Sequence, residues 1–191
     1  MKIGIVLYPL EYPNYAEYKI REAMCHICFK YNLDDVIFVG FKGTDPHMCC
    51  KGFPYHFGRN EDNIKVRPLE LCSRGLHFCW ELDAVFDYYP LREFGLEGVN
   101  NRYFIALPEG PICYGTIKMC SNVLNILEEI PRDMAEFYHE ELRNGKRFAE
   151  AIMRTGLYEL TNNAVNEFIA KNKNENGYVN LIPYNEGGEK A

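Results

Sequence analysis

Apolar residues follow two different patterns along this chain, one typical of strands and one typical of helices. Up to about residue 130, short apolar runs rich in β-branched and aromatic residues alternate with turns that contain glycine and proline. Strands are predicted at residues 2–8, 36–41, 64–69, 76–79, 102–107, 113–119 and 122–126. The segment Pro108-Glu109-Gly110-Pro111 is expected to be the turn that joins the strands at 102–107 and 113–119. We therefore expect an α+β fold whose sheet of about six or seven strands is mixed, mostly antiparallel and split.

Apolar residues recur at the spacing of a helix near the N-terminus, in one short central segment and throughout the last third of the chain. Residues 14–31 carry a capping pair, Asn14 and Glu17, followed by one apolar face. A short helix is expected at 81–89, where Pro90 ends it. Three further helices are predicted at residues 133–143, 147–154 and 157–172. We expect residues 1–130 to form an α+β domain, and residues 131–191 to form a helical appendage packed on the same domain.

Composition and charge narrow the possible functions. The net charge of −6 and the scattered lysines and arginines argue against a nucleic-acid partner, because binding to phosphate backbones needs clustered cations. No apolar run approaches the ~20 residues of a membrane helix, and the run at 3–7 is short for the core of a signal peptide. We expect a cytoplasmic protein that does not bind membranes.

Eight cysteines raise two further questions. In a chain of this length without an export signal, free and mostly buried thiols are expected. Several cysteines nevertheless lie near histidines in the sequence, which leaves open whether a zinc site forms. The residues concerned are His47, Cys49, Cys50, Cys72, His77 and Cys79.

Four short motifs follow one another between residues 42 and 89. They are Lys42-Gly43-Thr44-Asp45, Cys50-Lys51-Gly52-Phe53, the strand-like segment from Cys72 to Cys79, and Asp87-Tyr88-Tyr89. In this order the motifs resemble an uncharacterised family of proteins and domains common in bacteriophage genomes. The resemblance covers residues 38–130. It implies a phage-type protein that acts in the host cytoplasm, and it carries no established activity.

The same region is more remotely similar to ADP-ribosyltransferases. In those enzymes a strand ending in His-Gly holds the nicotinamide ribose of NAD, and a second strand leads to a helix whose tyrosine stacks on nicotinamide. The resemblance implies an ADP-ribosyltransferase-like core and a pocket for NAD or a related nucleotide. It assigns ligand-binding roles to the corner residues Lys42, Gly43 and Thr44, to His77 at the cleft and to Tyr88 as the stacking ring.

The catalytic glutamate of that family has no clear counterpart here. Glu109, Glu128 and Glu129 are candidates because they lie near the later predicted strands. Lys42 also stands where the family has a histidine or arginine. Catalytic activity is therefore left open.

A second hypothesis is a non-catalytic inhibitor that binds and neutralises a host protein, such as a defence protein. Acidic residues gather between positions 128 and 141, where a solvated helix face is the ordinary explanation. The same surface could bind a basic partner. Candidate aromatic anchors for that interface are Phe94, Phe137 and Tyr138.

Overall fold

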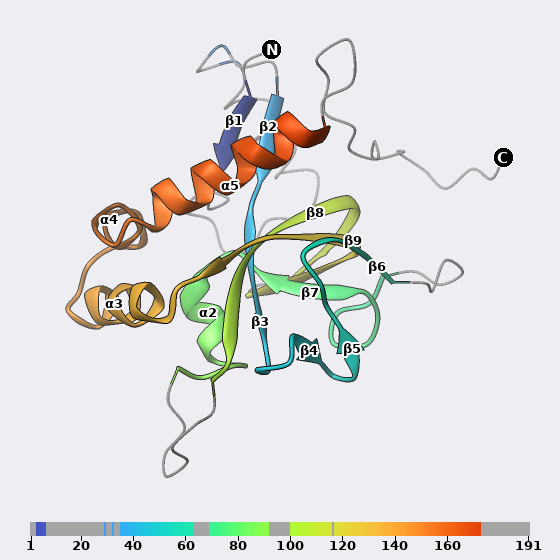
Figure 1. Ribbon diagram of the computed structural model, residues 1–191, viewed down its shortest axis with the longest axis horizontal. Coiled ribbons are helices and arrows are strands. Elements are labelled where there is room, and N and C mark those ends of the chain that lie inside the picture. The colour runs from blue at the N-terminus through green and yellow to red at the C-terminus, as the bar shows by residue number, and fades with distance from the viewer. Residues whose placement is uncertain are drawn as a thin grey trace, which may run out of the picture.

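The computed structural model describes residues 3–6, 29, 32, 35–62, 69–91, 100–115 and 117–172. Nine strands are found in this part of the chain (Figure 1): β1 Ile3–Val6, β2 Asp35–Phe38, β3 Gly40–Thr44, β4 Cys49–Cys50, β5 Phe53–Pro54, β6 Gly58–Glu61, β7 Leu76–Cys79, β8 Arg102–Tyr114 and β9 Lys118–Ile130. The four helices described are α2 Leu82–Phe86, α3 Arg132–Arg143, α4 Phe148–Arg154 and α5 Leu157–Asn172. The expected α+β class with mostly antiparallel strands is confirmed, although the nine described strands are divided among one sheet of five and two of two, in place of one sheet of about six or seven.

The main sheet contains five strands in the order β6-β9-β7-β3-β8, and all of its pairings are antiparallel. An additional pairing joins β8 to β9 along almost their whole length. Strands β9, β7, β3 and β8 therefore form a closed circuit in which each strand has a partner on both sides. The parallel pair β1–β2 and the short pair β4–β5 lie outside this circuit.

The predicted strand at 36–41 is divided between two sheets. Its first part pairs with β1 as β2, and after Val39 the chain continues as β3 in the main sheet, which Figure 1 shows as one long run. Gly40 permits this passage, because a Cβ there would lie 2.5 Å from Cδ2 of Phe78 and 2.9 Å from the carbonyl oxygen of Cys79. The close approach of β3 to β7 thus depends on a residue without a side chain.

The turn predicted at Pro108-Glu109-Gly110-Pro111 is wrong. Strand β8 runs through this segment, and the connection to β9 lies between Tyr114 and Lys118. The pairing with β9 shifts between Glu109 and Ile112, and Gly110 has a φ of 72°. Gly110 and Pro111 therefore form a β-bulge, which uses the same residue types as a turn. The strand predicted at 122–126 is the middle of β9.

Apolar side chains pack on both faces of the circuit. One core cluster joins α2 and the three C-terminal helices to the strands, and Tyr138 of α3 is fully buried in it. The other cluster contains Phe78, Trp80 and Tyr55 and lies toward β4 and β5. Figure 1 shows α5 crossing the strands, with α3 and α4 together at one end of it.

The three C-terminal helices agree with the prediction to within one residue at each end. The helix expected at 81–89 is shorter, because α2 ends at Phe86 and the chain continues as a turn. Tyr138 is wrong as an interface anchor since it is buried, whereas Phe137 is 44% exposed. Most of the helix predicted at 14–31, residues 63–68 of the strand predicted at 64–69, and Phe94 lie outside the described residues.

None of the helices described here is long and apolar enough to cross a membrane.

Candidate functional site

The motifs of the central region converge on a pocket of about 260 Å³ between β3, β7, α2 and the start of β9. We call it the lysine pocket. Its lining residues are Phe41, Lys42, Gly43, Cys50, Lys51, Cys72, His77, Phe78, Cys79, Val85, Tyr88, Tyr89 and Lys118. Four of the five residues predicted to bind a ligand are among them. The fifth, Thr44, is fully buried, and its hydroxyl donates a hydrogen bond to the carbonyl oxygen of Asp45 at 2.8 Å.

Among the residues that the structure describes, three lysines and no aspartate or glutamate line the lysine pocket. Two of its other ionisable groups carry no negative charge that would offset the lysines. Burial raises the pKa of the Cys79 thiol to about 12, and burial also raises the pKa of the Tyr89 phenol, so both groups are neutral near pH 7. The pocket is therefore a locally positive region in a chain of net charge −6.

Lys42 is the most unusual of the three lysines because only 3% of its surface is exposed. Its Nζ lies 4.6 Å from the centre of the Tyr55 ring, and Cys50 lines the same pocket. None of the ion pairs formed by the described residues involves Lys42. Burial consequently lowers the pKa of this ammonium group below 10.5. A buried lysine without a carboxylate partner is costly to a folded protein and is characteristic of functional sites.

Two tyrosines form the aromatic side of the pocket, at the turn that follows α2. The Tyr88 ring is 49% exposed, and Nζ of Lys118 lies 5.0 Å from its centre. Tyr89 is half-buried and, like Cys50, lines the pocket. A flat group entering the pocket would therefore find an accessible aromatic ring beside an ammonium group.

Gly43 serves internal packing. A Cβ at this position would lie 2.6 Å from Cγ1 of Val85 and 2.6 Å from Cδ2 of Tyr89. The absence of a side chain at Gly43 thus allows α2 and the tyrosine turn to pack closely on β3. This contact explains the glycine without requiring a ligand.

His77 lines the pocket and also holds the turn before β7. Its Nε2 accepts a hydrogen bond of 2.8 Å from the backbone N–H of Cys72, which requires an unprotonated Nε2. Burial lowers the pKa of His77, the positive charges of Lys42 and Lys118 lower it further, and a hydrogen bond with the Gly75 backbone opposes the shift. His77 is therefore neutral at pH 7 and fixes Cys72, which has a φ of 68°, at the pocket rim.

The role of His77 predicts a pH dependence of stability. Because its pKa is lowered in the folded protein from 6.5, the unfolded chain takes up a proton at higher pH. The stability contributed by neutral His77 is complete above pH 6.5 and is lost as the pH falls below it. Between about pH 7.5 and about pH 5, the free energy of unfolding measured with urea should fall more for the wild type than for His77→Gln. The glutamine keeps a hydrogen-bond acceptor but does not titrate. Equal losses would show that His77 does not need to be neutral.

The three candidate glutamates lie away from the lysine pocket. Glu129 forms an ion pair with Arg102, with its Oε2 2.5 Å from Nη2. Glu128 is exposed and, with Glu109, lines a separate cavity of about 470 Å³ between the sheet and α5. None of the three lines the lysine pocket.

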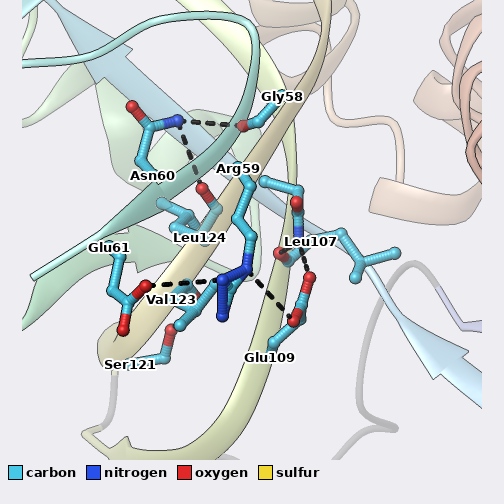
Figure 2. Close-up of polar contacts among 10 residues, drawn as sticks. Gly58, Arg59, Asn60, Glu61, Leu107, Glu109, Ser121, Val123 and Leu124 are labelled. Carbon is cyan, nitrogen blue, oxygen red and sulfur yellow. Dashed lines mark hydrogen bonds and ion pairs between the residues drawn. The ribbon is translucent and has the colours of Figure 1, made fainter. Parts of the chain in front are cut away.

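Glu109 is instead part of a polar cluster in which Glu109 and Asn125 are buried and Arg59 and Glu61 are exposed (Figure 2). The Glu109 side chain is 5% exposed, and its carboxylate accepts a hydrogen bond of 2.5 Å from Nδ2 of Asn125. Nε of Arg59 lies 3.8 Å from Oε2 of Glu109, and Figure 2 shows Arg59 reaching both this carboxylate and Glu61. The cluster ties β6, β8 and β9 together.

The possible zinc ligands do not gather around one point. Among the residues that the structure describes, which include all six candidates, no group of three or more histidine, cysteine, aspartate or glutamate side chains could hold a metal ion. Cys50, Cys72, His77 and Cys79 are instead distributed around the wall of the lysine pocket.

Several pocket residues were not predicted. Lys51 could have been found, since it belongs to the Cys50-Lys51-Gly52-Phe53 motif. Lys118 carries no signal of its own in the sequence, because it reaches the pocket through the pairing of β9 with β7, where it lies opposite Cys79.

Comparison with protein families gives one match. Residues 38–140 match the family described as a domain of unknown function, DUF7666. The matched region and the resemblance noted in the sequence both begin at residue 38. The match ends at residue 140, ten residues after the end of the resemblance. Neither the curated proteins nor the solved structures contain a match to this chain.

Proposed function

Because the chain belongs to the DUF7666 family, whose function is unknown, we propose a function from the geometry of the lysine pocket: it binds a nucleotide of the NAD type, or part of one. The observation that carries this proposal is Lys42, a buried ammonium group with no carboxylate partner among the described residues. A phosphate in the pocket would be its missing counter-charge. Lys51 and Lys118 line the same pocket and would bind further phosphate oxygens.

The size and lining of the pocket limit the ligand further. Its volume of about 260 Å³ lies below the ~300–1,000 Å³ of pockets that enclose drug-sized ligands. We therefore propose that one nucleotide unit is enclosed and that any second unit extends into solvent. The base or nicotinamide would lie against Tyr88, whose ring is accessible.

We also propose that the site is ADP-ribosyltransferase-like, because β7 is followed by α2 and Tyr88 in the order found in those enzymes. This part of the proposal rests on the sequence resemblance alone. The proposal is limited to binding, because Glu109, Glu128 and Glu129 do not line the pocket. A phage-type origin and action in the host cytoplasm are proposed on the same resemblance.

Calorimetric titration of the protein with AMP, ADP-ribose, NAD and adenosine tests the proposal. We expect the phosphate-bearing ligands to bind at least about tenfold more tightly than adenosine, since adenosine leaves the lysines without a partner. At a concentration of about 100 times Kd, a ligand should stabilise the protein by about 2.7 kcal/mol.

Matched lysine variants locate the binding site. Lys118→Ala should weaken AMP binding about tenfold, because it removes one charged contact. Lys146→Ala is the control, since this lysine pairs with Glu150 on α4 and lies outside the pocket. Equal affinity for AMP and adenosine, or equal effects of the two variants, would refute the proposal. If no nucleotide binds, the inhibitor hypothesis becomes the better one, and a single host protein should be recovered stoichiometrically by the immobilised chain.

A further inference from the structure

Two free cysteines, Cys113 and Cys120, lie directly opposite each other on the antiparallel strands β8 and β9. Residues opposite each other in such a pair project to the same face of the sheet. The register therefore places their Cβ atoms about 4.5–5.5 Å apart. The closeness of Cys113 also contributes, after burial, to the raised pKa of the Cys120 thiol.

The backbone at this pair suits a disulfide. Opposite residues in antiparallel strands have Cα atoms about 4.5 or 5.5 Å apart, and both distances fall within the ~4.4–6.8 Å found across disulfides. The two sulfurs differ in access, since Cys113 is half-buried and Cys120 is fully buried. An external reagent would therefore meet Cys113 first.

We propose that Cys113 and Cys120 are a redox pair that forms a cross-strand disulfide by exchange with a low-molecular-weight disulfide such as oxidised glutathione. The Cys113 thiolate attacks one sulfur of oxidised glutathione, the S–S bond breaks, and one glutathione leaves and takes up the proton lost by Cys113. Cys120 then attacks the sulfur of Cys113 and releases the second glutathione, which takes up the proton of Cys120. Two protein thiols are oxidised, and one glutathione disulfide is reduced to two thiols.

The pair lies next to the lysine pocket. Cys120 is opposite His77 in the pairing of β9 with β7, and a Cβ built at Gly75 would lie 3.2 Å from Cβ of Cys120. Closing the S–S bond to about 2.05 Å would move Cys120 relative to His77, the residue that holds the pocket rim. This regulatory effect on the pocket rests on the proposed function, whereas formation of the disulfide does not.

The disulfide is tested on the full chain equilibrated in glutathione buffers of increasing oxidation, quenched by alkylation and mapped by peptide mass spectrometry. We expect a peptide pair linked through Cys113 and Cys120 in the wild type and in the control Cys72→Ser, which alters an exposed thiol of the pocket rim. In Cys120→Ala, Cys113 should instead accumulate as a mixed disulfide with glutathione. Accumulation of that mixed disulfide in the wild type, or a Cys120 link to another cysteine, would overturn the proposal.

The effect on the pocket is measured as the AMP dissociation constant of the reduced and oxidised forms. We expect at least a threefold difference in the wild type and none in Cys113→Ser, which cannot form the bond. Equal affinities of the two wild-type forms would overturn the regulatory effect. If AMP bound neither form while the linked peptide was present, the proposed function would fail and the redox pair would stand.

Discussion

Replacing Lys42 with methionine is expected to weaken nucleotide binding by at least about 30-fold while making the folded protein more stable. The affinity falls because the phosphate loses a buried counter-charge. The stability rises, by about 1–2 kcal/mol at pH 7, because methionine fills a similar volume without an ammonium group to desolvate. Calorimetric titration with AMP and urea denaturation measure the two effects on the same preparation.

The pH dependence of this variant tests the explanation. The pKa of Lys42 is lowered in the folded protein, so the wild type gains stability as the pH rises from that pKa to 10.5. The advantage of Lys42→Met should therefore shrink with rising pH. Lys51→Met is the matched control, since this pocket lysine is exposed and its replacement should not raise stability. A loss of stability in Lys42→Met at pH 7 would show that Lys42 supports the fold.

Replacing Asn125 with leucine is expected to lower the free energy of unfolding by about 2–4 kcal/mol. The change removes the N–H donor that lies 2.5 Å from Oε1 of Glu109 and leaves that carboxylate buried, with Arg59 at 3.8 Å as its remaining charged partner. It also removes the weaker hydrogen bond of 3.3 Å to the Leu107 carbonyl oxygen. Urea denaturation monitored by circular dichroism measures the loss.

A double-mutant cycle separates the buried charge from a change in packing. In a Glu109→Leu background no carboxylate is left to desolvate, so Asn125→Leu should cost at least about 1 kcal/mol less there than in the wild type. Equal costs in both backgrounds would show that the carboxylate is not the reason for the loss.

The sequence predicted the C-terminal helices well and the strand pairing poorly, for physical reasons. Helix α3 ends just before Asn144 and Gly145, and α4 ends just before Gly156, so the signals that end these two helices are local in the sequence. Helix α5 has its apolar residues at helical spacing, which is also local information. The segment 108–111 was misread because glycine and proline occur both in turns and in bulges. Only the partner strand distinguishes the two, and in β8 the pairing with β9 continues past the bulge.

The residues of the candidate site that belong to short sequence motifs could be predicted. Lys42, His77 and Tyr88 were each singled out from short patterns, and the fold brings all three to one pocket. Lys118 was not found, because its place beside Tyr88 depends on a pairing between strands almost 40 residues apart. The burial of Lys42 was also not predictable, since lysine is ordinarily an exposed residue.

The closed circuit of β3, β7, β9 and β8 has a consequence for amide hydrogen exchange. Strand β3 pairs with β8 along its whole length and with β7 at Phe41 and Cys79, while β7 pairs with β9 along its whole length. A strand held on both sides cannot separate without breaking both sets of contacts, so we expect its N–H groups to exchange through large, cooperative openings. The two-residue strands β4 and β5 pair only with each other within the described chain and can open locally. The amides of β3 and β7 in the wall of the lysine pocket should therefore keep their protons in deuterated solvent for much longer than those at Cys50 and Lys51. The rim is then the expected entry route for the nucleotide that we propose.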